Sequence, residues 1–145
     1  MREIFARTKS INPADSCYGK TALHLASKEG HLEVVKYIME QLADKNPAMI
    51  DGRTPIHCAA ENGHLEVVKY ISQYLENKNP PAMDEGWTPL HFAAQEGHLE
   101  IVKYIMEQLA DKNPAAIDGG WTPLHIASEQ GHLEIVKYIT DQLDD

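Results

Sequence analysis

A phrase that begins Thr-x-x-His recurs along the chain at almost constant spacing. Its copies start at Thr21, Thr54, Thr88 and Thr122, which are 33, 34 and 34 residues apart. Self-similarity at such a period is the signature of a repeat architecture, in which each unit buries its apolar face only against its neighbours. We therefore expect the 145 residues to form a stack of similar units.

The second copy illustrates the local structure expected of each unit. Thr54 is a typical helix N-cap, and Pro55 suits the first helical position, where its missing N–H costs nothing. Gly63 can take a positive φ and is expected to end this short helix. Apolar residues spaced four apart, from Val67 to Leu75, then predict a second helix. Each unit should therefore contain two antiparallel helices and a turn.

These phrases closely resemble the ankyrin repeat family. The resemblance rests on "TPLHFAA" at 88–94, on the matching phrases at the other three Thr, and on the "GHLEVV" and "GHLEIV" phrases that follow. It covers about residues 2–145. It implies an all-α repeat solenoid, an ankyrin-like stack of antiparallel helix pairs with short β-hairpin or turn tips. In this family, partners usually bind the hairpin tips and the concave face of the first helices.

The repeat boundaries predict a single ankyrin-repeat domain over 1–145. Its expected parts are a half repeat or N-cap at 1–20, repeat 1 at 21–53, repeat 2 at 54–87, repeat 3 at 88–121, and repeat 4 or C-cap at 122–145.

Two departures from the family pattern lead to expectations about the second helix. The family usually ends this helix with Gly, but this chain has Leu42, Leu75, Leu109 and Leu143 at that place. Because Leu continues the apolar row, we expect a second helix about one turn longer than usual, ending near the Asn-Pro pairs. Ser72 replaces an apolar residue and is expected to weaken the packing locally.

The sequence predicts packing, and not catalysis, for its most reactive side chains. Each of the eight histidines belongs to a Thr-x-x-His or a Gly-His phrase, so the repeat accounts for all of them. No H-E-x-x-H, Gly-rich phosphate loop or Cys pair is present. We therefore expect no enzyme, no catalytic residue, no cofactor and no metal. The resemblance implies that the first histidine set hydrogen-bonds within and between neighbouring repeats.

The charge and cysteine content narrow the classes of partner and location. A net charge of −9 works against binding to nucleic acid and to anionic membrane surfaces, since both require clustered cations. Two unpaired cysteines and the absence of a signal-peptide pattern indicate an intracellular, cytoplasmic protein. We also expect a monomer.

Recognition is expected at positions where the copies differ, because shared positions are needed for packing. By the resemblance, these positions line the hairpin edge and the concave surface. Trp87 and Trp121 are the expected anchors, since Trp is enriched at binding hot spots, and one Glu per repeat suggests an acidic groove that favours cationic groups. The candidate partner-binding residues are Trp87, Trp121, Arg53, Met49, Ile50, Met83, Ile117, Glu29, Glu61, Asn62, Gln95, Glu96, Glu129 and Gln130.

The leading hypothesis is a non-enzymatic interaction module that binds a protein or peptide with basic and apolar groups. A second hypothesis is a designed or consensus-like scaffold without a native partner, favoured by copies as similar as "IMEQLADKNPA" at 38–48 and 105–115. A third is a fragment of a larger multidomain ankyrin protein, favoured by a chain that starts within a repeat.

Overall fold

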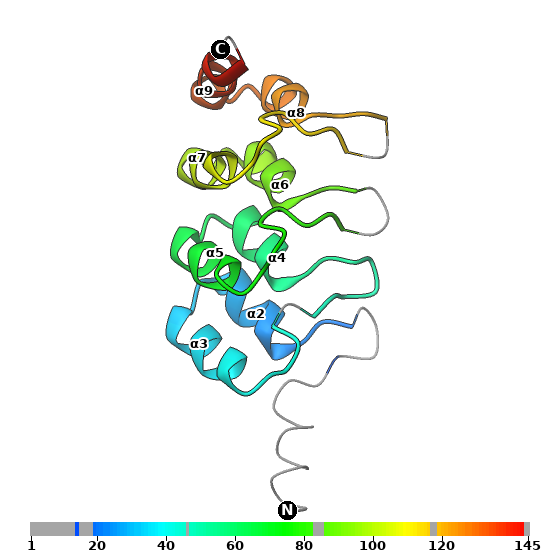
Figure 1. Cartoon of the computed structure of the whole chain (residues 1–145), viewed down its shortest axis with the longest axis vertical. Coiled ribbons are helices and arrows are strands. Elements are labelled where there is room, and N and C mark those ends of the chain that lie inside the picture. The colour runs from blue at the N-terminus through cyan, green and yellow to red at the C-terminus, as the bar shows by residue number, and fades with distance from the viewer. Residues whose placement is uncertain (1–13, 15–18, 46, 83–85, 117–118, 144–145) are drawn as a thin grey trace, which may run out of the picture.

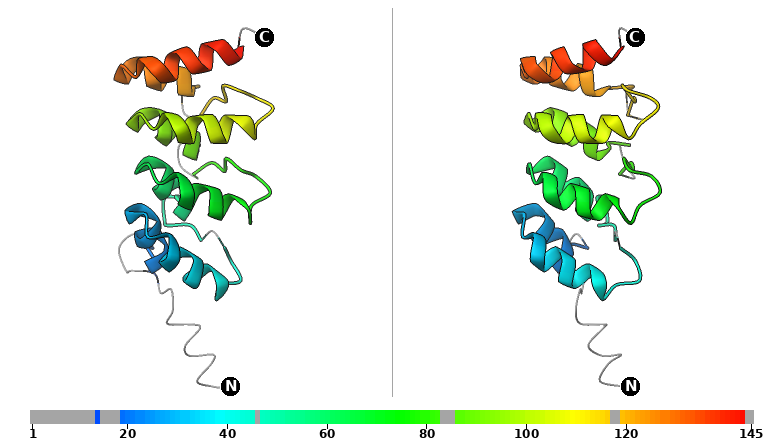
Figure 2. Two further views of the ribbon diagram at one scale, coloured as in Figure 1. Left: turned by 90° about the vertical axis from the view of Figure 1, so that its left-hand side faces the viewer. Right: turned by 60° about the vertical axis from the view of Figure 1, so that its left-hand side comes forward.

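The computed structural model describes residues 14, 19–45, 47–82, 86–116 and 119–143. In these ranges the chain forms four helix pairs stacked along one axis (Figure 1). The first helices of the pairs form an inner layer, the second helices form an outer layer, and the connecting tips project on the side of the inner layer. Figure 2 views the outer layer, whose helices lie one above another. The predicted all-α stack of antiparallel helix pairs is confirmed.

The inner and outer helices alternate along the chain. The inner helices are α2 (Ala22–Glu29), α4 (Pro55–Glu61), α6 (Pro89–Glu96) and α8 (Pro123–Gln130). The outer helices are α3 (Leu32–Glu40), α5 (Leu65–Ser72), α7 (Leu99–Glu107) and α9 (Leu133–Leu143). The proposed half repeat at 1–20 lies almost entirely outside the described residues.

The tips are hairpin turns without regular strands in the part of the chain that the structure describes. In the first tip, the Met49 N–H donates to the carbonyl of Arg53 over 2.7 Å. The second and third tips have the equivalent bonds from Ala82 to Trp87 and from Ala116 to Trp121, at 2.8 and 2.7 Å. These bonds fix the direction in which the chain enters each inner helix.

Each inner helix begins with the same reciprocal cap. In repeat 2 the Thr54 N–H donates to Nδ1 of His57 over 3.1 Å, and the Thr54 hydroxyl accepts from the backbone N–H of His57. Two N–H groups at the helix start are thereby satisfied within four residues of sequence. The same capping box occurs in all four repeats, as the Thr-x-x-His phrase predicts.

The core is continuous through the stack because equivalent residues of successive repeats bury one another. The inner helices contribute Ala26, Ala59, Ala93 and Ala127, whose small side chains let these helices approach closely, and the outer helices contribute Ile38, Ile71, Ile105 and Ile139. The inner helices also contact one another more extensively than the outer helices do. The inner layer is therefore the more closely packed layer of the stack.

The expectation of longer second helices is wrong for α3, α5 and α7. These helices end at Glu40, Ser72 and Glu107, well before the Asn-Pro pairs. The physical reason is a lysine that reaches back to a carbonyl near the helix end, as the Lys112 ammonium does to the Met106 carbonyl over 2.8 Å. Lys45 and Lys78 make the equivalent contacts with the carbonyls of Met39 and Ser72. In contrast, α9 continues to Leu143.

The asparagine of the Asn-Pro pair joins one repeat to the next instead of ending a helix. The Asn79 side-chain oxygen accepts from the Leu90 N–H over 2.9 Å, and Asn113 does the same for Leu124 over 3.2 Å. Both N–H groups lie in the first turn of an inner helix, where no partner within the helix exists.

Ser72 does not weaken the packing through an unsatisfied hydroxyl. Its side chain is buried, donates to the Lys69 carbonyl over 2.9 Å, and lies 2.8 Å from the hydroxyl of Tyr104 in the next repeat. The expected local weakening of the apolar packing stays a prediction, although the neighbouring tyrosine supplies a partner for the buried hydroxyl.

Candidate functional site

Three sets of equivalent residues define the surface between the tips and the inner helices. The tip column is the residue before each capping Thr: Lys20, Arg53, Trp87 and Trp121. The middle column lies four residues after each Thr: Leu25, Cys58, Phe92 and Ile126. The end column lies seven residues after each Thr: Lys28, Glu61, Gln95 and Glu129. Together these columns are called the inner groove below.

A pocket of about 120 Å³ shows that the three columns line one surface in repeats 1 and 2. It lies between repeats 1 and 2 and is lined by all six of their column residues, together with His24, Met49 and Asn62. The N-terminal part of the groove carries the cations Lys20, Lys28 and Arg53. Its middle-column thiol, Cys58, is not activated, because burial raises the pKa of Cys58 to about 11.

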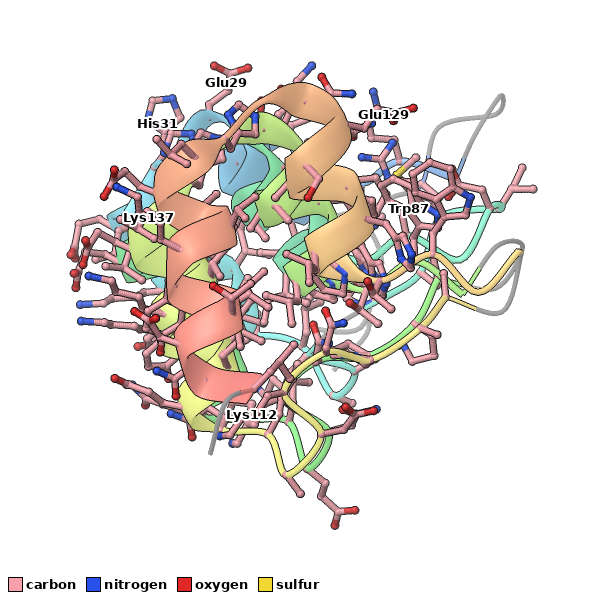
Figure 3. All side chains as sticks on the ribbon, turned by 90° about the horizontal axis from the view of Figure 1, so that it is seen from above. Glu29, His31, Trp87, Lys112, Glu129 and Lys137 are labelled. Atoms are coloured by element: carbon pink, nitrogen blue, oxygen red, sulfur yellow. The ribbon has the colours of Figure 1, made fainter. Side chains whose placement is uncertain are left out.

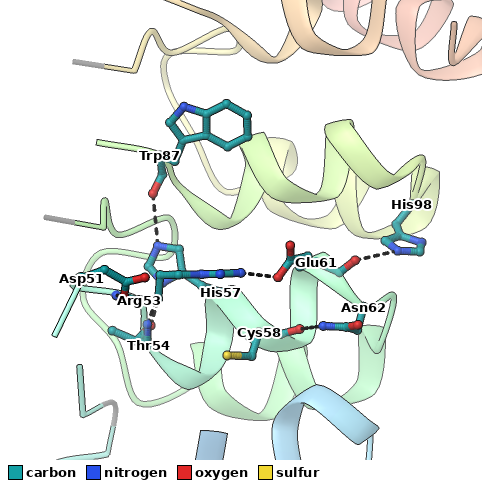
Figure 4. A network of polar contacts seen from close by, with 9 residues as sticks. All are labelled: Asp51, Arg53, Thr54, His57, Cys58, Glu61, Asn62, Trp87 and His98. Carbon is teal, nitrogen blue, oxygen red and sulfur yellow. Dashed lines mark hydrogen bonds and ion pairs between the residues drawn. The ribbon is translucent and has the colours of Figure 1, made fainter. Parts of the chain in front are cut away.

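Arg53 occupies the centre of a polar network in repeat 2 (Figure 4). Its guanidinium forms an ion pair with Glu61 of the end column, and its central carbon lies 4.6 Å from the ring centroid of Phe92 in repeat 3. Its backbone N–H donates to the Asp51 carboxylate over 3.0 Å. Both side chains of the ion pair are less than one third exposed. Arg53 therefore contacts side chains of the end column and of the next repeat at once.

The two predicted anchors lie in different environments. Trp87 is half-buried, and its ring centroid lies 5.2 Å from that of Phe92 and 5.7 Å from that of His91. Trp121 is 40% exposed and contacts His125 through a T-shaped ring pair with centroids 5.8 Å apart. Trp121 therefore presents more free aromatic surface than Trp87 does.

The four glutamates proposed as one acidic row belong to two different columns. Glu61 and Glu129 lie seven residues after their Thr, whereas Glu29 and Glu96 lie eight residues after it. One residue rotates a side chain by about 100° around a helix. In Figure 3, Glu129 accordingly lies on the side of Trp87 and the tips, while Glu29 lies near His31 and the outer layer. Glu61 is paired with Arg53, whereas Glu129 forms no ion pair with any residue that the structure describes.

The remaining predicted residues are only partly brought together. Met49 lines the pocket, and Ile50 is 71% exposed at the first tip. The Asn62 amide bonds back to its own helix, at 2.8 Å from the Cys58 carbonyl. Gln95 belongs to the end column, whereas Gln130, like Glu96, lies one residue further on. Met83 and Ile117 lie outside the described residues.

Sequence reasoning missed the middle column, and Phe92 above all. Leu25 is 49% exposed, Phe92 is half-buried, and Cys58 and Ile126 are buried. The signal was present, because this position holds four different residues in four repeats. It was overlooked because each of them reads as an ordinary residue of an apolar helix face.

The first histidine set links repeats through an uncharged ring. Nδ1 of His57 accepts from Thr54, and Nε2–H then donates to the Trp87 carbonyl, 3.2 Å away. His24 and His91 bond the carbonyls of Arg53 and Trp121 in the same way. Burial lowers the pKa of His57 to about 4, and it also lowers the pKa of His24 and of His91. These rings are structural groups and are poorly suited to accept protons near neutral pH.

The second histidine set points to the preceding repeat. Nε2 of His98 lies 2.9 Å from the Glu61 carbonyl, and that of His132 lies 2.9 Å from the Gln95 carbonyl. Among the described residues, no group of three or more His, Cys, Asp or Glu side chains is placed to hold a metal ion. No helix in the same ranges is long and apolar enough to cross a membrane.

Comparison with known families agrees with this architecture. The model of "Ankyrin repeats (3 copies)" matches residues 3–84, 42–116 and 73–144, which together span nearly the whole chain. No curated protein sequence matches the chain. Proteins of this family are generally interaction modules and are typically not enzymes. The repeat period, the stacked helix pairs and the family match together establish that the chain belongs to the ankyrin repeat family.

Proposed function

We propose that this chain is a non-enzymatic module that binds a partner protein or peptide through its inner groove and hairpin tips. The observation that carries the proposal is the exposed Trp121 ring beside the half-buried Trp87. Exposed large aromatic surface next to a groove favours partner binding, because burying it on association is strongly favourable. The backbone under both rings is held by capping boxes and by histidine bonds between repeats, so little ordering is required on binding.

The test replaces both tryptophans with alanine and compares the effect with that of replacing an exposed tyrosine of the outer layer. Proteins retained by the immobilised chain are identified by mass spectrometry, and their affinities are measured by calorimetry. Truncating a hot-spot Trp costs about 2 kcal/mol, or about 30-fold in Kd. Trp87→Ala with Trp121→Ala should weaken binding at least that much, whereas Tyr37→Ala, which removes a 60% exposed ring from α3, should not. Unchanged affinity in the folded double variant would refute the anchor role.

A scaffold without a native partner is the second candidate function. It is favoured by the identical eleven-residue stretch at 38–48 and 105–115, since function rarely requires such uniformity away from the groove. The same capture experiment separates the two, because a scaffold retains the same proteins whether or not its two tryptophans are present.

The proposed partner is a protein or peptide with cationic and apolar groups, bound by a monomer in the cytoplasm. The net charge of −9 opposes nucleic acid and anionic membranes as ligands. Light scattering after size exclusion tests the monomer, with a mass near 16.3 kDa expected.

A further inference from the structure

Repeat 2 contains a complete cation site whose cation is supplied by the chain itself. The Arg53 guanidinium has a carboxylate partner in Glu61 and an aromatic ring in Phe92, 4.6 Å from the guanidinium carbon. An ion pair combined with an aromatic face is a strong arrangement for guanidinium, because its planar group stacks and donates hydrogen bonds at the same time. The inner groove is therefore shaped to hold such a group at the junction of its columns.

Repeat 4 has a carboxylate and an aromatic ring without a tip-column cation, although its ring lies at the place of Arg53 and not at that of Phe92. Glu129 lies in the same column as Glu61, and Trp121 takes the place of Arg53 in the tip column. In the part of the chain that the structure describes, no cationic side chain forms an ion pair with Glu129. Trp121 is 40% exposed. In the described part of the chain, a carboxylate without an ion pair and a partly exposed aromatic ring thus lie in the two columns whose members Arg53 and Glu61 touch in repeat 2.

Repeat 3 lacks the carboxylate of this pair, and repeat 1 lacks both the carboxylate and the aromatic ring. Repeat 3 has Trp87 in the tip column, but Gln95 replaces the carboxylate and the Trp87 ring is half-buried. Repeat 1 has Lys20 and Lys28 in these columns, so it has neither the carboxylate nor the aromatic ring. No Lys or Arg occurs at 79–102 or at 113–136. The electrostatic potential along the groove therefore favours a cation toward repeat 4.

We propose that repeat 4 binds an arginine side chain of the partner, between the Trp121 ring and the Glu129 carboxylate. The partner's guanidinium takes the role that Arg53 has in repeat 2. This inference rests on the proposed function, since it names the partner chemistry for the same groove, and it orients the partner with its arginine toward the C-terminal repeat.

The test uses a probe that does not depend on an identified partner. The probe is an acetylated tetra-arginine peptide, and its control is the tetra-citrulline peptide, which keeps the planar group but loses the charge. The chain has two tryptophans, so its indole N–H signals in a ¹H–¹⁵N spectrum are two and are assigned with Trp121→Phe. The Trp121 signal should shift with increasing tetra-arginine until it saturates, which gives a Kd. The Kd for tetra-citrulline should be at least fivefold higher.

Two variants with the same change of charge locate the site. Glu129→Gln should weaken tetra-arginine binding at Trp121 at least fivefold. Glu134→Gln removes an exposed carboxylate of the same repeat that pairs with Lys137 on α9, and it should change the Kd less than twofold. Equal effects of the two variants, or equal binding of the two peptides, overturn the proposal. Such a result leaves the interaction module intact if the double tryptophan variant still loses its captured partner.

Discussion

Acidification should destabilise this stack through a buried histidine, and the size of the effect follows from the contacts of His57. The ring is fully buried and is bonded at both nitrogens, as acceptor for Thr54 and as donor to the Trp87 carbonyl. Protonation at Nδ1 would abolish the first contact and place a charge in the core. Burial accordingly lowers the pKa of His57 from 6.5 to about 4 in the folded chain.

The sign and the pH window follow from linkage. The folded-state pKa lies below the unfolded value, so the unfolded chain binds the proton first and stability falls as the pH falls from about 6.5 toward about 4. The contribution of the neutral, buried His57 ring to stability is fully present above this pH window. The difference between the two pKa values corresponds to about 3 kcal/mol in total, of which about half should be lost between pH 7 and pH 5.

Urea unfolding at pH 7, 6 and 5 measures this loss when wild type is compared with His57→Gln. Glutamine can still bond the Thr54 N–H from the third helical position, but it lacks the ring N–H that donates to Trp87. Wild type should be more stable at pH 7 by about 1 kcal/mol or more, and this difference should fall by about 2 kcal/mol at pH 5. The other buried histidines are present in both proteins and cancel.

The control is His31→Gln, which changes an exposed ring at the start of α3. Its stability should follow that of wild type at every pH. A gap between wild type and His57→Gln that stays constant from pH 7 to pH 5 would refute the reasoning, since it would mean that the buried ring does not resist protonation.

Three further predictions test other contacts. Gly63→Ala should lower the free energy of unfolding by about 2–3 kcal/mol, because φ is +83° and the new Cβ would lie 2.7 Å from a histidine ring of the next repeat. Gly131→Ala should lower it by about 1 kcal/mol, because φ is +77° but no described atom lies within 4 Å of the new Cβ. Equal losses in urea unfolding would rule out the ring contact. Ser72→Ala and Tyr104→Phe each remove one partner of a 2.8 Å bond and should each cost about 1 kcal/mol, and the double variant should cost less than their sum; full additivity would contradict the bond. The buried Cys58 thiol has a pKa of about 11. In a variant without the other cysteine, this thiol should react with a disulfide reagent at least about 100-fold more slowly in the folded chain than in urea. Equal rates would contradict its burial.

The inner helices could be predicted from the sequence because their signals are local. The capping Thr, the Pro after it, the His at the third position and the Gly past the end all lie within about ten residues. Gly63 has φ +83°, and all four caps form as the phrase predicts. The fold of the whole stack then follows, since repetition of one unit leaves neighbouring units as the only cover for its apolar face.

The ends of the outer helices could not be predicted in the same way because their determinants are distant. Lys78 reaches back six residues to the Ser72 carbonyl, and Asn79 bonds an N–H eleven residues ahead. Leu75, which continues the apolar row, therefore lies beyond the end of α5. A periodic pattern shows which face is apolar, but it does not show where competing partners capture the last carbonyls.

The sequence predicted which positions of the candidate site vary between repeats, but not which of these residues pair with one another. The sequence indicates that tip and end positions vary, but it does not show that Arg53 and Glu61 neutralise each other. It also does not show that glutamates one residue apart in register face different sides of the stack, as Glu29 and Glu129 do.

Variation between repeats is therefore not sufficient evidence of recognition in a repeat protein. At repeat 2, Arg53 already has an ion pair with Glu61 and a ring contact with Phe92 of the next repeat, although its buried Nε has no hydrogen-bond partner in the described part of the chain. At repeat 4, the same columns hold Trp121 and Glu129 without an internal cation in the described part of the chain. A partner can add a contact only where the stack has left one incomplete, because an already paired charge must be released before it can bind again. A varying residue should therefore contribute more to partner binding when it has fewer contacts within the stack. Repeat 4 should accordingly contribute more binding free energy than repeat 2, although both vary equally in sequence.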